Sequence, residues 1–165
     1  EEPLEATTAD LQAKAAPMAI HAADASPVSI AVGDGALEGD VPADTSHVVG
    51  TIQYGVMDRG GEVFMLVYHA KGTRGAEPAA KASGLPVEIV GTIADGVLTV
   101  TVLHEGKPVA DSGLVAVLPQ ELEHVEGTTD ADGKATFPLT ESGWVGIRAM
   151  VPVEGAGEHD GKTYE

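Results

Sequence analysis

Cysteine is missing from this chain of 165 residues, and aromatic side chains make up only 4% of it. The first absence excludes disulfide bonds, zinc sites built on cysteine and a thiol nucleophile. The second argues against a platform of stacked rings that binds sugars. The lone tryptophan, Trp144, stands at the start of a predicted strand. A ring in that position normally packs in the core, so we expect Trp144 to be buried.

Basic residues are also scarce, because 9 Lys and Arg stand against 26 Asp and Glu and leave a formal net charge of −17. A surface of this sign repels phosphate groups, so neither nucleic acid nor an anionic lipid surface is expected as a partner. The acids are dispersed along the chain, which favours a role in solubility. The alternative is attraction for cations, either diffuse or at a site.

Long apolar runs are absent as well. No run approaches the ~20 residues that span a bilayer, so no direct membrane insertion is expected. The chain has no uncleaved signal core, and we expect a secretory signal to have been removed before Glu1. Residues 1–27 are rich in alanine and weakly patterned. They are expected to be poorly structured or to form a short helix over residues 7–14.

What the chain does contain is a series of short strands and turns. Residues 98–103 alternate as a half-buried strand does, with Leu98, Val100 and Val102 on one face. Asp132-Gly133, between alternating segments, predicts a tight hairpin in which both turn residues take positive φ. A further strand is expected over residues 144–149. This spacing is typical of an antiparallel β-sandwich of the immunoglobulin type.

The first half of the chain is also predicted to be β-rich. Strands are expected over residues 28–32, 47–54, 63–70 and 87–90, and a turn of helix over 79–83. Because residues 63–70 are nearly all apolar, we expect a central strand that is covered on both faces. The predicted organisation is therefore all-β with two small β-sandwich domains, residues 1–91 and residues 92–165.

Three segments carry a resemblance to known families: Gly106-Lys107-Pro108-Val109, residues 129–137 (Thr-Asp-Ala-Asp-Gly-Lys-Ala-Thr-Phe), and Gly143-Trp144. Together they resemble the carboxypeptidase-regulatory or transthyretin-like sandwich, a module common in secreted bacterial proteins. Residues 54–61, 64–71 and 84–90 extend the likeness. In this order the segments are similar to a family of two-domain periplasmic proteins of largely unknown function. Some members of that family are described as accessory components of nickel or cobalt uptake.

The resemblance implies an exported bacterial binding protein, periplasmic or at the cell surface. It implies an accessory role that handles nickel, cobalt or a small ligand, with an envelope or transporter protein as partner. The alternative is a structural or interaction module of the cell envelope that acts through protein–protein contacts. Family members continue beyond residues 160–165 into one more strand, so the second domain is expected to lack its last strand. Their early histidine has no counterpart here.

Histidines are the only transition-metal ligands that the composition offers. Glu158-His159-Asp160, in a Gly-rich segment, is the densest group of donors, and His124 follows two nearby glutamates. These four residues are the candidate metal ligands, with ordinary exposed surface as the alternative. His69 ends an apolar strand, where a histidine in the core or at a strand edge is expected. His104 closes the next predicted strand beside Glu105, where a solvated strand end is expected.

No pattern points to catalysis. A Gly-x-Ser-x-Gly elbow is absent, and the glycines of residues 33–39 come without the lysine of a phosphate-binding loop. Asp130-Ala131-Asp132-Gly133 resembles the start of a calcium loop, with Glu141 at loop position 12, but strand-like residues lie between them and favour a turn. The sequence therefore predicts a protein that binds rather than an enzyme.

Overall fold

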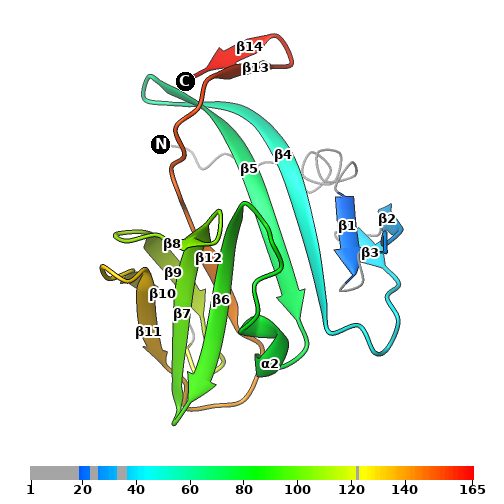
Figure 1. Ribbon diagram of the computed structural model, residues 1–165, viewed down its shortest axis with the longest axis vertical. Coiled ribbons are helices and arrows are strands. Elements are labelled where there is room, and N and C mark those ends of the chain that lie inside the picture. The colour runs from blue at the N-terminus through cyan, green and yellow to red at the C-terminus, as the bar shows by residue number, and fades with distance from the viewer. Residues whose placement is uncertain (1–18, 23–25, 33–36, 122) are drawn as a thin grey trace. The chain divides into compact units, whose positions relative to one another are not determined.

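The computed structural model describes residues 19–22, 26–32, 37–121 and 123–165. The helix expected over residues 7–14 lies outside these residues. As predicted, the described chain is almost entirely β, with one short helix, α2 (Ala76–Ala79). It forms two compact units, residues 1–70 with 153–165, and residues 71–152 (Figure 1). No helix among the described residues has the length and apolar character needed to cross a bilayer.

The first unit contains three small antiparallel sheets, and β5 continues three residues into the second unit. One sheet has the order β1-β4-β5, and the pairs β2-β3 and β13-β14 form the other two. The strands are β1 (Ala19–Ala22), β2 (Ile30–Val32), β3 (Leu37–Gly39), β4 (His47–Arg59), β5 (Glu62–Thr73), β13 (Gly157–His159) and β14 (Lys162–Tyr164).

The strand expected to be central, residues 63–70, is instead the edge strand β5. Its neighbour β4 occupies the middle of the β1-β4-β5 sheet, and Val63 and Tyr68 remain 38% and 46% exposed. The apolar run indicated burial on both faces, but no layer of described residues in this unit covers both faces of β5. The apolar run alone could not reveal this, because it does not specify which strands pair with residues 63–70 or which layers cover them.

The second unit is a β-sandwich. One sheet has the order β11-β7-β6, with β8 also paired to β7, and the other has the order β10-β9-β12. The strands are β6 (Val87–Ala94), β7 (Val97–His104), β8 (Lys107–Pro108), β9 (Gly113–Val117), β10 (Val125–Thr128), β11 (Lys134–Pro138) and β12 (Gly146–Ala149).

The core of this unit lies between the two sheets. The predicted alternation is confirmed, because Leu98, Val100 and Val102 of β7 are at most 5% exposed. They pack against Leu114 and Ala116 of β9 from the opposite sheet. Partly buried aliphatic side chains from β6, β10 and β12 extend the cluster. Burial of these side chains between the sheets is the main driving force for the sandwich.

Two tight turns build the sheet around β7. Asp95 and Gly96 have φ of +50° and +73°, and Glu105 and Gly106 have φ of +49° and +74°. Positive φ at both central residues is typical of a two-residue type I′ hairpin, so β6-β7 and β7-β8 are consecutive hairpins. The predicted domain boundary at residue 91 therefore falls inside β6, and the structure divides the chain at residues 70 and 152 instead. The segment around Gly96 is a hairpin turn, not a linker.

The hairpin predicted at Asp132-Gly133 is not formed. β10 pairs with β9 and β11 pairs with β7, so the turn carries the chain from one sheet to the other. Gly133 has φ of +71°, but Asp132 does not take positive φ. The carboxylate of Asp130 accepts hydrogen bonds from the N–H groups of Asp132 and Lys134, both at 2.9 Å, and this side-chain bonding closes the loop.

Candidate interaction surface

The candidate metal ligands lie in two separate segments, one at the β13-β14 hairpin and the other just before β10. Asp160 forms the β13-β14 turn with Gly161, and the Nε2 of His159 lies 3.4 Å from Asp160 Oδ2. Glu158 precedes His159 on β13 and so projects from the other face of the hairpin. His124, in the other unit, has its Nε2 3.9 Å from Glu126 Oε1. Within the described ranges, no three His, Asp or Glu side chains gather as a metal-binding group.

His69 and His104, the two histidines at strand ends, each lie beside a residue of a neighbouring strand. The Nδ1 of His69 lies 3.0 Å from the hydroxyl of Thr51, which joins β5 to β4. Burial lowers the pKa of His69 below its ordinary value, because the charged imidazolium would lose hydration there. His104 closes β7 and pairs with Lys107 across the turn. These positions support the structural interpretation of both residues.

Two of the segments that carry the family resemblance meet at Thr129, where hydrogen bonds join them. The side chain of Thr129 is 2% exposed. Its hydroxyl donates to the carbonyl of Val109 at 2.7 Å and accepts from the N–H of Ser112 at 2.8 Å. The Ser112 hydroxyl in turn donates to the carbonyl of Met150 at 3.3 Å. The hydroxyl of Thr129 therefore satisfies two backbone groups of the loop that leads into β9.

Gly133 lies in close contact with Pro108 and Val109, on the segment that follows Thr129. A Cβ atom built on Gly133 would lie 2.7 Å from the Cβ of Pro108 and 2.8 Å from the N of Val109. Only glycine allows this approach, and its φ of +71° is also unfavourable for other residues. The Gly-Lys-Pro-Val and Thr-Asp-Ala-Asp-Gly segments therefore contact each other to hold the fold.

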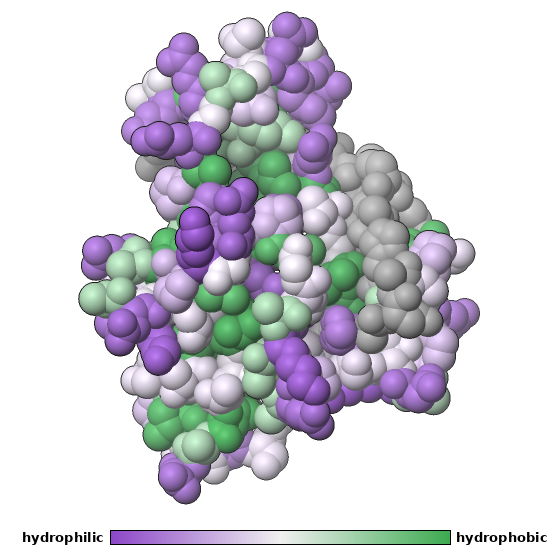
Figure 2. Space-filling view, in the orientation of Figure 1, coloured by the Kyte–Doolittle hydropathy of each residue, from purple (hydrophilic) through white to green (hydrophobic). Residues whose placement is uncertain are grey.

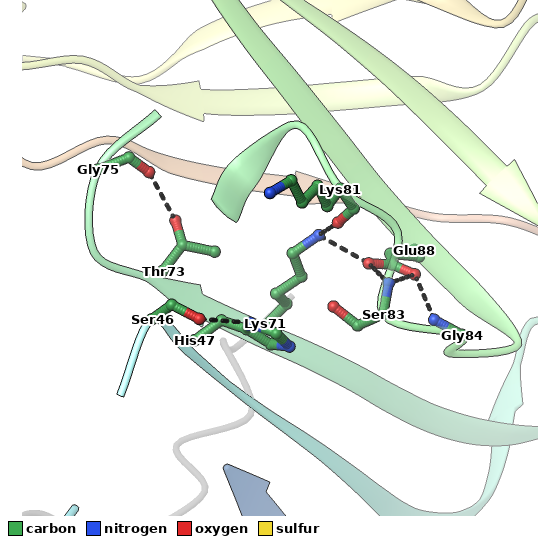
Figure 3. A network of polar contacts seen from close by, with 9 residues as sticks. All are labelled: Ser46, His47, Lys71, Thr73, Gly75, Lys81, Ser83, Gly84 and Glu88. Carbon is green, nitrogen blue, oxygen red and sulfur yellow. Dashed lines mark hydrogen bonds and ion pairs between the residues drawn. The ribbon is translucent and has the colours of Figure 1, made fainter. Parts of the chain in front are cut away.

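A buried ion pair, which the sequence did not predict, lies at the start of the second unit (Figure 3). The Nζ of Lys71 is 2.7 Å from Glu88 Oε1, and their side chains are 7% and 2% exposed. Lys71 also donates to the carbonyl of Lys81 at 2.6 Å. The Glu88 carboxylate accepts the N–H of Ser83 at 2.7 Å and the N–H of Gly84 at 3.1 Å. These bonds hold residues 81–84 against β6.

The charge state of this pair follows from its partners. Burial by itself raises the pKa of Glu88, but the Lys71 ammonium and the Ser83 N–H outweigh it and hold the pKa below its ordinary value. Both carboxylate oxygens accept hydrogen bonds, so the charge of Glu88 is fully engaged with Lys71 and with the loop of residues 81–84. The sequence held one indication of this pair: Lys71 follows the apolar residues 63–70, and Glu88 is the one charge within the apolar residues 87–90.

The strongest departure from expectation concerns Trp144, which is 75% exposed instead of packed in the core. Its ring lies over the backbone of Gly146, since a Cβ atom there would come within 2.5 Å of the indole Cη2. Gly143 in the same loop approaches Pro119 so closely that a Cβ would lie 2.8 Å from the proline Cβ. Two glycines therefore let the loop lie flat and place the ring outside the sandwich.

Trp144 belongs to a small apolar surface on the outer face of the β10-β9-β12 sheet. Gly146 pairs with Val117, which is 44% exposed and points away from the core. Val115 lies on the same outer face, between Glu126 on β10 and Arg148 on β12. We call Trp144, Val117 and Val115 the Trp144 surface. On the face of the molecule that Figure 2 shows, hydrophobic residues likewise lie between hydrophilic ones.

A family model described as a domain of unknown function, DUF4198, matches residues 61–152, which is more than half of the chain. The chain belongs to the DUF4198 family. The match includes the whole of the second unit, with the Trp144 surface and the Lys71–Glu88 pair. No curated protein and no solved structure matches the chain. The nickel or cobalt role and the carboxypeptidase-regulatory likeness therefore remain predictions.

Proposed function

We propose that this DUF4198 protein is an exported binding module of the bacterial cell envelope that acts through protein–protein contacts at the Trp144 surface. The observation that carries the proposal is the lone tryptophan, which is 75% exposed in the loop that leads into β12. Burying so large a ring at an interface contributes more binding free energy than burying most other side chains does. Tryptophan is enriched among the residues that dominate binding energy.

The local structure supports a contact that is formed in advance. The indole already lies against Gly146, so binding does not require ordering a free side chain. Val117 and Val115 supply further apolar area, and the charges of Glu126 and Arg148 flank it. An apolar centre with a polar rim is the usual anatomy of a protein interface.

The net charge supports a partner of opposite sign. With a formal charge of −17, the protein repels nucleic acid, anionic lipid and further copies of itself. A partner protein with a basic surface is attracted over the same distances, and its association is faster at low salt. Placement in the periplasm or at the cell surface is part of the proposal and rests on the resemblance to exported sandwich modules.

Handling of nickel or cobalt, the other expectation from the resemblance, has less support in the geometry. The described residues bring together only pairs of donors, such as His159 with Asp160 at 3.4 Å. A pair of exposed side chains leaves most coordination positions to water, so it does not select a transition metal. We therefore place the interaction role first.

The proposal is tested by capture of an envelope partner and by the fluorescence of Trp144. Immobilised wild-type protein is exposed to envelope extract, and the bound proteins are identified by mass spectrometry. Each purified candidate is then titrated against the wild type. We expect emission from the single tryptophan to shift to the blue as the partner covers it. We expect Trp144→Ala to weaken binding at least about thirtyfold, since such anchors contribute about 2 kcal/mol or more.

Ile93→Ala provides the matched control. Ile93 is 47% exposed on β6, in the other sheet, so this variant removes an exposed apolar side chain elsewhere. It should bind as the wild type does. Equal binding by the wild type and Trp144→Ala would refute the proposal, as would a captured partner that leaves the emission unchanged.

A further inference from the structure

The second unit has a groove where the two sheets of the sandwich end side by side. β10 is an edge strand of one sheet and β11 is an edge strand of the other (Figure 1). Residues of these two strands line the groove. The groove has a volume of about 380 Å³. Its lining includes Val125, Glu126, Gly127, Thr128, Asp130, Lys134, Ala135, Thr136, Phe137 and Pro138. The Trp144 surface does not contribute to it.

The wall formed by β11 is closed to further strand pairing. The bond from Val102 N to Gly133 O shows which β11 residues face β7, so Lys134, Thr136 and Pro138 direct their backbone groups into the groove. Both backbone groups of Lys134 are bonded to Asp130, at 2.9 Å and 2.7 Å. Pro138 has no N–H, and its carbonyl accepts from Gln120 Nε2 at 2.7 Å. Only Thr136 remains open on this edge.

The wall formed by β10 is open. Thr129 N donates to Ser112 O across β9, so by alternation the N–H and C=O groups of Glu126 and Thr128 point away from β9. No hydrogen bond joins these groups to any residue that the structure describes. Two residues spaced by two along a strand present the donor and acceptor pattern that another strand would complete.

The side chains along β10 select what such a strand would carry. Glu126 is exposed and lies on the outer face of the sheet, so a residue opposite it meets a negative charge. Gly127 faces inward against the ring of Phe137, which would be 3.0 Å from a Cβ at that position. A residue opposite Gly127 therefore points into the groove, toward the apolar lining of Ala135, Phe137 and Pro138.

We propose that the β10 edge binds an extended segment of a partner protein by strand addition, with a basic side chain opposite Glu126 and an apolar one opposite Gly127. A second copy of this chain is disfavoured, because the added strand would bring like charges together on proteins of net charge −17. The inference rests on the proposed function only in assuming that the protein binds protein, since Trp144, Val115 and Val117 do not line the groove and Glu126 alone borders both surfaces.

The test uses a synthetic heptapeptide, Arg-Val-Thr-Val-Arg-Val-Thr, titrated into ¹⁵N-labelled full-length protein and followed by NMR. We expect saturable shifts of the amide signals of residues 125–128 and 134–137. An acidic version with Glu in place of Arg should bind at least about fivefold more weakly, given the energy of a cross-strand charge pair. A version with N-methyl groups on its Arg and Thr residues, the set that would lie opposite Glu126 and Thr128, should lose binding, because these residues can no longer donate hydrogen bonds to β10.

Thr128→Pro tests the edge from the side of the protein. It removes an N–H that points away from β9, which is a position where an edge strand tolerates proline. We expect loss of peptide binding with an unchanged spectrum elsewhere. If this variant does not fold, the N-methylated peptide still decides the question. Shifts that survive N-methylation, that map to other residues, or that fail to saturate would overturn the inference.

The outcome is separable from that of the proposed function. Trp144→Ala should leave peptide binding unchanged, because Trp144 does not line the groove. Conversely, failure of the heptapeptide to bind would not alter capture of a partner through Trp144.

Discussion

The ammonium group of Lys71 and the carboxylate of Glu88 meet at 2.7 Å, and both side chains are almost fully buried. The pair lies at the point where the chain enters the second unit. The loop of residues 81–84 is bonded to the same two side chains. Buried charges are tolerated when partners satisfy them and become costly when one partner is removed. This pair therefore controls the stability of the outer face of β6.

Glu88→Gln should lower the free energy of unfolding by about 3 kcal/mol, because it leaves the buried ammonium of Lys71 without a countercharge. Chemical denaturation of the full chain measures the change. Glu77→Gln is the control. It breaks an ion pair of similar length, 2.6 Å, whose side chains are 83% and 68% exposed. That variant should unfold almost as the wild type does. Equal effects of the two substitutions would contradict the assigned role.

Gly133→Ala should destabilise the sandwich by about 3 kcal/mol, since the new Cβ meets Pro108 and the backbone is held at positive φ. Gly106→Ala separates these two causes. Gly106 has a similar φ of +74° but nothing within 4 Å of an added Cβ. We expect a cost of about 1 kcal/mol there, from the backbone conformation alone. Thermal and denaturant unfolding of both variants give the comparison.

Trp144→Ala should change the free energy of unfolding by less than about 0.5 kcal/mol, because the ring is mostly in water. A tryptophan packed in the core would cost about 3–5 kcal/mol when truncated to alanine. The same measurement on Phe137→Ala, whose side chain is 2% exposed, supplies the large value for reference. A large loss of stability in Trp144→Ala would mean that the ring is buried in solution.

The first unit should lose stability as the pH falls through the range in which His69 titrates. Burial lowers the pKa of His69 in the folded chain, so the unfolded chain binds the proton first. The contribution is fully present above the ordinary pKa of about 6.5 and is lost as the pH falls to the folded pKa. Denaturation at pH 8 and at pH values between about 6.5 and 5 measures it. His69→Gln should flatten this part of the profile.

Nickel and cobalt should raise the melting temperature of the wild type only slightly, because the described residues offer pairs of donors. Calorimetric titration and thermal shift with each ion test this. A saturable shift that grows with metal concentration and disappears in His159→Ala would instead establish the metal role. His124→Ala tests the other candidate in the same way.

Several features followed from local sequence. The alternation of Leu98, Val100 and Val102 predicted the buried face of β7, because a strand repeats every two residues whatever it packs against. The all-β class followed from the same periodicity and from frequent turn residues. The acidic balance predicts that polyanionic partners are disfavoured, and this prediction needs no knowledge of the fold because charge acts at long range.

The three-dimensional arrangement settled what periodicity could not. Asp132-Gly133 has the composition of a hairpin, but the hydrogen bonds of Asp130 and the packing of Gly133 on Pro108 send β10 and β11 to different sheets. Lys71 and Glu88 are 17 residues apart, and nothing local indicates that they meet. The exposure of Trp144 and the open edge of β10 depend on which strands lie beside them. These features arise from contacts between distant segments, and no local pattern encodes such contacts.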